Sequence, residues 1–305
     1  MNYVLTRGAR SVLTVLLVVT FTFFILRMSG DPAMMILSAD APPEAIEAFR
    51  QSWGLDAPLS HQYFGYLGNI LAGNFGVSMR NGASAMSLVL EAIPATLAIT
   101  LPAFALKLLL GIPAGIFAAF HRNTWIDRLI MSFSVAGHSM PSFVLGVLLV
   151  LIFAVSLGWL PSGGYASWGH AILPIITLSI GGAAVLARYT RSAMLEVLGQ
   201  PYIRAASAKG LSWRLVVIRH ALPNAAAPIL TIMGLMLGAL IAGAVVVESV
   251  FSWPGVGRLI VSAVANRDLA VVQAALLLVT FSMVGANLLV DALNVMIDPK
   301  IRSSK

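Results

Sequence analysis

The residues able to carry chemistry are few in this chain, and they exclude several classes of enzyme. Only 10% of the 305 residues are charged and none is cysteine, which excludes a disulfide framework, a thiolate metal site and a cysteine nucleophile. A phosphate-binding loop ends in Gly-Lys-Ser/Thr, but no lysine here follows a glycine. The His-Glu-x-x-His and Gly-x-Ser-x-Gly signatures are also missing. We therefore expect no catalytic residue, no metal site and no ATP hydrolysis in this chain.

Lys107 and His138 are two of the polar residues that lie inside long apolar segments, where an ionisable side chain is costly and commonly functional. Lys107 has no evident intramembrane acid as its partner. It could face a water-filled path, pair with an acid of another subunit, or snorkel toward an interface. His138 could ligate a metal or shuttle a proton, although an isolated histidine is more commonly a hydrogen-bonded packing residue. We therefore name Lys107 and His138 as the candidate residues of a translocation path.

The elements that must position these residues are membrane-spanning helices. The chain is 59% hydrophobic with a mean hydropathy of +0.90, and a spanning helix needs roughly 20 apolar residues. We expect an all-α integral membrane protein of one domain, residues 1–305, with about six transmembrane helices. Such runs extend over residues 9–28, 95–120, 129–157, 172–186, 225–247 and 270–297.

Small residues and prolines within these runs predict how the helices pack. Gly111 and Gly115 recur at a spacing of four, as do Gly234, Gly238 and Ala242. Such rows allow helix backbones to approach closely. Bends or local openings of helices are expected at four prolines, which are Pro113, Pro141, Pro174 and Pro228.

The distribution of charge predicts that both termini are cytoplasmic, because cytoplasmic connections are rich in Lys and Arg. The connection over residues 188–223 is the most basic, while the segment over residues 30–93 is acidic and is expected outside the cytoplasm. This asymmetry accounts for the net charge of +7, so lipid and not nucleic acid is the expected partner. The basic residues of the connection are Arg188, Arg191, Arg204, Lys209, Arg214 and Arg219.

The acidic segment over residues 30–93 also has helical character. Residues 43–53 carry Ile46 and Phe49 at helical spacing, and Tyr63 and Tyr66 continue the pattern after Pro58. Aromatic residues at such positions commonly rest at the membrane interface. The alternative is contact with an extracytoplasmic partner.

The connection over residues 188–223 is longer than two spans need. We expect a short helix from Tyr202 to Lys209 that ends at Gly210, because glycine tolerates positive φ. Ser212 is the expected N-cap of a helix over residues 213–220, and Pro223 begins the return to the bilayer. The alternative to a force-transmitting element is an ordinary amphipathic surface hairpin.

Motifs in this connection carry a resemblance to a known family. Ala205, Ala206 and Gly210, with Leu222-Pro223, resemble the Glu-Ala-Ala loop of binding-protein-dependent ATP-binding-cassette (ABC) importers. Arg204 stands where that motif has Glu, and His220 where it has Ile. Nearly the whole chain is similar to the first, dipeptide permease B-like subunit of the dipeptide, oligopeptide and nickel importers. The shared motifs include Asp31-Pro32, Gly54-Leu55-Asp56, Pro94-Ala95-Thr96, Pro141-Ser142-Phe143, Thr190-Arg191-Ser192, Phe251 to Gly257 and Asp298-Pro299-Lys300.

The resemblance implies a type I importer permease in the bacterial cytoplasmic membrane, with a coupling helix that docks on an ATPase. It implies a second, similar permease, two ATPase subunits that bind ATP and Mg, and an extracytoplasmic binding protein, with no cofactor in this chain. The implied coupling residues are Tyr202, Ile203, Arg204, Ala205, Ala206, Ser207, Ala208, Lys209, Gly210 and Leu211, and the loop returns to the membrane at Leu222 and Pro223.

The substrate stays open within this family. Peptides are favoured, and nickel or a metal chelate is the alternative. A more distant alternative is an ATPase-independent secondary transporter, for which inverted repeats with broken helices are expected. An intramembrane hydrolase would need paired catalytic residues on adjacent spans.

Overall fold

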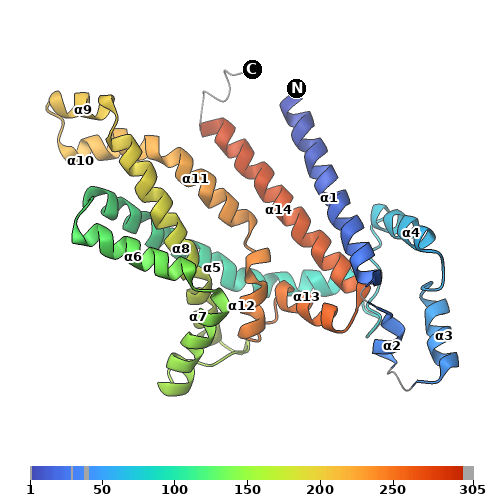
Figure 1. Cartoon of the computed structure of the whole chain (residues 1–305). Coiled ribbons are helices and arrows are strands. Elements are labelled where there is room, and N and C mark those ends of the chain that lie inside the picture. Colours follow the sequence, from blue (N-terminus) through green and yellow to red (C-terminus); the bar gives the residue numbers. More distant parts are fainter. Residues whose placement is uncertain (1, 29, 38–40, 298–305) are drawn as a thin grey trace. The chain divides into compact units, whose positions relative to one another are not determined.

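The computed structural model describes residues 2–28, 30–37 and 41–297, and helices account for most of them (Figure 1). The chain divides into two compact units, residues 1–96 with 254–282 and residues 97–253 with 283–305. The single permease domain over residues 1–305 stays a prediction. The α-helices are α1 (Asn2–Met28), α2 (Pro32–Ile36), α3 (Pro43–Ser52), α4 (Leu59–Leu71), α5 (Ala85–Phe120), α6 (Trp125–Ser139), α7 (Ser142–Leu149), α8 (Gly169–Leu198), α9 (Pro201–Ala208), α10 (Trp213–Val216), α11 (Leu222–Gly238), α12 (Val245–Val250), α13 (Val256–Ala265) and α14 (Leu269–Ile297).

The expected all-helical membrane architecture is confirmed. Among the described residues, five helical stretches are long and apolar enough to cross a membrane, and a bent pair brings the number of possible spans to six. The five stretches are Gly8–Met28, Ala85–Phe120, Gly169–Leu198, Trp213–Gly238 and Leu269–Leu289.

The third expected span, residues 129–157, is not one straight helix. It consists of α6 and α7, which meet at an angle of 100°, and α7 continues into a π-helical stretch over Val150–Ser156. The break lies at Pro141, which has no N–H to continue α6 and which disfavours helical geometry in the residue before it. Met140 accordingly has φ of −80° and ψ of 120°. The bend expected at Pro141 is therefore a complete break.

Two further boundaries differ from those expected. α8 extends to Leu198, so Arg188 and Arg191 belong to this helix and the connection begins only after it. α11 ends at Gly238, whereas the fifth run was expected to continue to residue 247.

α13 is a short apolar helix that is below the length of the runs expected from the sequence. Pro174 and Pro228 lie inside α8 and α11, so neither proline ends its helix.

In the first unit, the segment after α1 forms three helices. The helix expected over residues 43–53 is α3, and the aromatic residues after Pro58 belong to α4. Asp31 caps α2 by accepting the N–H of Ala33 at 2.9 Å, and it also accepts Nε of Arg50 in α3 at 2.8 Å. The hydrogen bond and charge of Asp31 raise the pKa of the Arg50 guanidinium. The Asp31-Pro32 motif thus fixes the start of α2 and holds α3.

The aromatic residues of α4 pack against α1. The Tyr63 hydroxyl lies 2.7 Å from the Thr20 hydroxyl, and the ring of Tyr66 stacks on Phe23 with a centroid distance of 5.6 Å. Phe23 is completely buried. The two tyrosines therefore hold α4 to the first span.

The start of α5, α13 and the start of α14 form the other core of the first unit. Its buried members are Ala85, Val89, Ala263, Val271, Val272, Ala274 and Ala275. The loop before α5 is held by the buried Asp268, which accepts hydrogen bonds from the hydroxyl of Ser78 and the N–H of Met79. Because α5 begins at Ala85, the last nine residues of the expected external segment belong to a membrane-crossing helix.

Candidate functional site

The short helix expected from Tyr202 to Lys209 is present as α9, which begins and ends one residue earlier than the sequence predicted. Pro201 occupies its first turn, where a missing N–H is tolerated, and Gln200 before it is extended. Gly210 has φ of +83°, and its N–H bonds to the carbonyl of Ser207 at 3.0 Å. Since a Cβ disfavours positive φ, Gly210 allows the sharp end of the helix.

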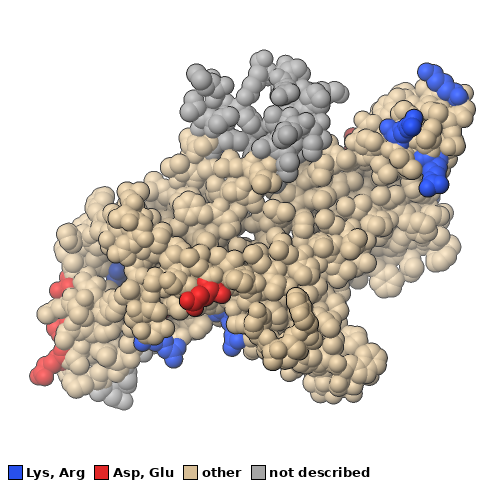
Figure 2. Space-filling model, turned by 180° about the vertical axis from the view of Figure 1, so that it is seen from behind, with Lys and Arg blue, Asp and Glu red and all other residues tan. Residues whose placement is uncertain are grey.

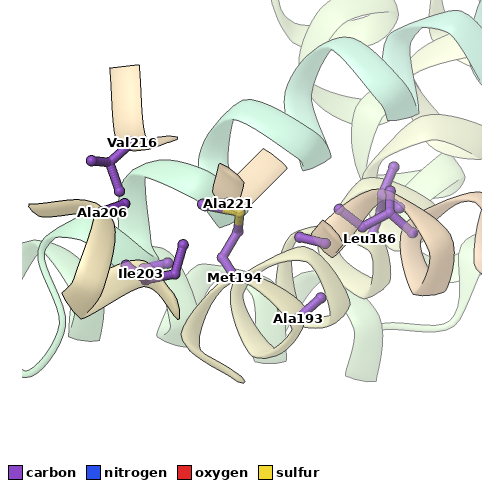
Figure 3. Packing of buried hydrophobic residues seen from close by; sticks show 10 residues of the cluster. Leu186, Ala193, Met194, Ile203, Ala206, Val216 and Ala221 are labelled. Atoms are coloured by element: carbon purple, nitrogen blue, oxygen red, sulfur yellow. The ribbon is translucent and has the colours of Figure 1, made fainter. Parts of the chain in front are cut away.

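One face of α9 is buried in the core of the second unit, where Ile203 is 2% exposed and Ala206 is 7% exposed. These side chains point toward residues from α5, α8 and the segment from α10 to α11 (Figure 3). Burying an isoleucine side chain contributes about 1.5–3 kcal/mol, so α9 is fixed to these helices. The cluster, called here the hairpin core, consists of Ala119, Leu186, Ala193, Met194, Ile203, Ala206, Val216, Ala221, Ala225 and Ile229.

The other face of α9 is exposed. The Tyr202 side chain is 43% exposed, and Leu211 after the turn packs against the hairpin core. A helix fixed on one side and free on the other presents a rigid surface to a partner. The other exposed residues of the segment expected to contact the ATPase are Arg204, Ala205, Ser207, Ala208, Lys209 and Gly210.

The second arm of the hairpin leads directly into α11. Ser212 precedes α10 in extended conformation as expected for an N-cap, but its side chain makes no capping bond. α10 passes through a π-helical turn over Val217–Ala221 into α11. Leu222 packs against the hairpin core, whereas Pro223 is exposed. Basic atoms gather over the α9–α10 hairpin, residues 201–216 (Figure 2). The exposed basic residues of the hairpin are Arg204, Lys209 and Arg214, and Arg219 is exposed in the π-helical turn that follows.

An ion pair that the sequence analysis did not identify joins α6 to α8. Arg191 donates Nε to one Asp127 oxygen at 2.6 Å and Nη2 to the other at 2.7 Å. Asp127 is 3% exposed and also accepts the N–H of Asn123 at 3.0 Å. Such bidentate pairs fix relative orientation as well as contributing energy. Arg191 belongs to the Thr190-Arg191-Ser192 motif of the resemblance, but no local pattern indicates its partner, which lies 64 residues away in the sequence.

The glycines of α5 lie directly against α8, as their spacing predicted. A Cβ on Gly111 would be 2.8 Å from the carbonyl oxygen of Ala183, and one on Gly115 would be 2.5 Å from that of Ala187. Both distances are too short for a real Cβ contact. Only glycine therefore permits this approach of α5 and α8.

The two residues expected in a translocation path are in different environments. Lys107 lines a cavity in the second unit together with residues of α5, α7 and α8. His138 in α6 is exposed, and the residues lining this cavity include its neighbour Gly137 but not His138. No group of three or more His, Cys, Asp or Glu side chains in the described part of the chain could hold a metal ion.

Comparison with known proteins identifies the family. The model described as "Binding-protein-dependent transport system inner membrane component" matches residues 111–303, and its N-terminal counterpart matches residues 1–100. The glutathione transport system permease protein GsiC of Escherichia coli (strain K12) is 44% identical over 303 residues, which cover 99% of each chain. GsiC of Shigella flexneri serotype 5b (strain 8401) is 43% identical over 303 residues, which again cover 99% of each chain.

Solved structures share the fold of this chain. An inward-facing MetNI methionine ABC transporter has a TM-score of 0.58 at 20% identity, covering 70% of this chain and 97% of its own. An amino acid ABC transporter with histidines has a TM-score of 0.51 at 20% identity, and the match covers 68% of this chain and 93% of the transporter chain. The family match and the 44% identity to a permease over 99% of both chains set aside the ATPase-independent transporter and the intramembrane hydrolase. The chain belongs to the family of binding-protein-dependent inner membrane transport components, as a multi-pass permease subunit of an ABC importer whose ATPase is a separate subunit.

Proposed function

We propose that this permease subunit imports small peptides of about the size of glutathione. The observation that carries this proposal is the 44% identity to a glutathione permease over 99% of both chains. Glutathione is a tripeptide, so the relative favours the peptide side of the choice left open by the sequence. Nickel or a metal chelate is retained as the competing outcome of the test.

The proposed complex contains a second homologous permease, two ATPase subunits that bind ATP and Mg, and an extracytoplasmic binding protein. This chain contributes half of the path and binds no cofactor itself. The basic α9–α10 hairpin lies on the cytoplasmic side, and both termini share that side, because cytoplasmic connections are enriched in Lys and Arg.

The proposed contact with the ATPase is the segment Tyr202 to Leu211. Its support is the combination of an exposed face with Ile203 and Ala206 buried in the hairpin core. A displacement of α9 must move α8 and α11 as well, because the buried side chains of all three helices pack together at high density. The hairpin therefore transmits force to the spanning helices.

The substrate test is uptake into proteoliposomes that contain the complete transporter with its binding protein. We compare labelled glutathione, a labelled dipeptide and a labelled nickel chelate, each with and without ATP inside. ATP-dependent accumulation of glutathione or the dipeptide supports the peptide assignment. ATP-dependent accumulation of the nickel chelate alone overturns it and leaves the family assignment unaffected.

The coupling test uses Gly210→Val with Gly199→Val as its control. Gly210 has φ of +83°, whereas Gly199 lies in the same connection with φ of −77°. Only the first substitution forces a β-branched residue into the left-handed region, which costs about 1–2 kcal/mol and alters the end of α9. We expect Gly210→Val to lose ATP-driven uptake or ATPase docking while Gly199→Val retains both. Normal assembly and uptake by Gly210→Val would contradict the coupling assignment.

A further inference from the structure

The second unit contains a cavity of about 210 Å³. A water molecule takes up about 30 Å³ of liquid volume, so the cavity has room for roughly seven waters. Pockets for whole drug-sized ligands are larger, about 300–1,000 Å³. The cavity therefore suits one end of a peptide better than the whole of it. It is lined by Thr100, Ala103, Lys107, Gly137, Met140, Ser142, Leu145, Thr177, Leu178, Gly181, Gly182, Ala239, Leu240 and Gly243.

Lys107 is the charged residue in the wall of this cavity. Within the described residues it has neither an ion pair nor a hydrogen bond. Its stem crosses Gly182 of α8, since a Cβ at Gly182 would lie 2.6 Å from Lys107 Cδ. The absence of a side chain at residue 182 therefore makes room for the lysine. A cation inside a membrane-spanning helix is costly and requires a compensating partner.

The broken third span contributes a second source of positive potential. Ser142 and Leu145, in the first turn of α7, line the same cavity. Pro141, before α7, provides no side-chain cap. The first N–H groups of a helix lack intrahelical acceptors, and the helix dipole is positive at this end. In transporters with discontinuous helices, such ends face anionic groups of the substrate.

We propose that the Lys107 cavity is the subsite that binds a carboxylate of the peptide during its passage through the permease. This inference rests on the proposed function, because it assigns a subsite to the same substrate. The lysine supplies the charge, the start of α7 supplies further positive potential, and the volume matches one end of a tripeptide. An unchelated divalent cation is repelled by both groups, so the cavity selects for acidic ligands.

One other source could provide the compensating charge, namely an acidic side chain of the second permease. The two cases differ in the effect of neutralising Lys107. A structural ion pair stabilises the assembled complex, whereas a substrate subsite changes transport and leaves assembly intact. The experiment therefore measures uptake and assembly on the same preparations.

The experiment compares Lys107→Met and Lys107→Arg in the complete transporter in proteoliposomes, with labelled glutathione as the probe. Methionine keeps an unbranched side chain, one heavy atom shorter than lysine, and removes its charge, while arginine keeps the charge. We expect Lys107→Met to lower ATP-dependent uptake roughly tenfold or more, because that is the effect of losing one charge-assisted hydrogen bond to the substrate. We expect Lys107→Arg to retain most of the uptake and both variants to assemble with the partner subunits.

Two further variants test the same subsite through a neighbour. A methyl group at Gly182 must displace the Lys107 side chain, whereas one at Gly181 meets only the carbonyl oxygen of Gly137 at 3.7 Å. Gly182→Ala is thus expected to reduce uptake more than Gly181→Ala. A larger loss of uptake in Gly182→Ala than in Gly181→Ala supports the inference that the position of the Lys107 side chain matters for transport.

The outcomes separate this inference from the proposed function. If the unmodified transporter does not import glutathione or a dipeptide, the proposed function fails. If it does and Lys107→Met imports equally well, the subsite is wrong while the function stands. Loss of complex assembly in Lys107→Met, restored in Lys107→Arg, also overturns the subsite and identifies an ion pair between the two permeases.

Discussion

Replacing Ile203 with alanine tests whether α9 is fixed to the spanning helices by its buried face. Ile203 is 2% exposed in the hairpin core, and truncation of a buried isoleucine to alanine costs about 2–5 kcal/mol. If ~2 kcal/mol of this loss falls on the local opening of α9, amide hydrogen exchange there becomes about 30-fold faster. Informative amides are those of Lys209 and Gly210, which bond to the carbonyls of Ala205 and Ser207. Exchange measured by mass spectrometry on the detergent-solubilised transporter provides the readout.

The matched control is Ile218→Ala, because Ile218 lies in the π-helical turn after α10 and is 52% exposed. This substitution is expected to change stability by no more than about 0.5 kcal/mol. Ile203→Val, which removes one methyl group, should fall between the two with a cost of about 0.5–1.5 kcal/mol. Equal exchange of α9 in Ile203→Ala and Ile218→Ala would refute a hairpin held by its buried face.

Two further predictions concern the contacts that join α8 to its neighbours. Asp127→Ala leaves Arg191 without its bidentate partner, so we expect a loss of about 1–3 kcal/mol, seen as a lower unfolding temperature of the purified transporter. Glu in place of Asp127 should lose less, and no difference between the two variants would count against the ion pair. Gly115→Val places Cβ 2.5 Å from the backbone oxygen of Ala187 and should separate α5 from α8, lowering the yield of folded protein. Gly65→Val, where no atom lies within 4 Å of the added Cβ, should be milder, and equal yields would contradict the close approach.

The sequence predicted best what depends on local chemistry and hydrophobicity. The apolar runs identified the spans because a lipid environment demands long uninterrupted apolar helices. Gly210 marked the end of α9 because its positive φ excludes most other residues. The spacing of Gly111 and Gly115 predicted a close helix contact, and the structure supplies the partner, α8.

The sequence failed where a structure depends on distant contacts. Pro141 was expected to bend a helix, but the direction and the 100° angle of the break depend on packing. The end of α8 could not be predicted from hydropathy, because Arg188 and Arg191 resemble the flank of a span. Arg191 is accommodated within the helix by Asp127, a partner that no local pattern identifies. α13 is too short for a search based on long apolar runs.

The contacts of α5 with α8 join the cavity to the hairpin. Lys107, Gly111 and Gly115 recur at a spacing of four, and each lies against α8, at Gly182, Ala183 and Ala187 respectively. Farther along, Ala119 of α5 and Met194 of α8 belong to the hairpin core that also buries Ile203. A close-packed interface of this kind moves as a unit, because interiors have few voids into which one helix could shift alone. In the proposed mechanism, an ATPase that moves α9 also moves the wall of the Lys107 cavity, because α5 and α8 form a contiguous packed link between the two sites.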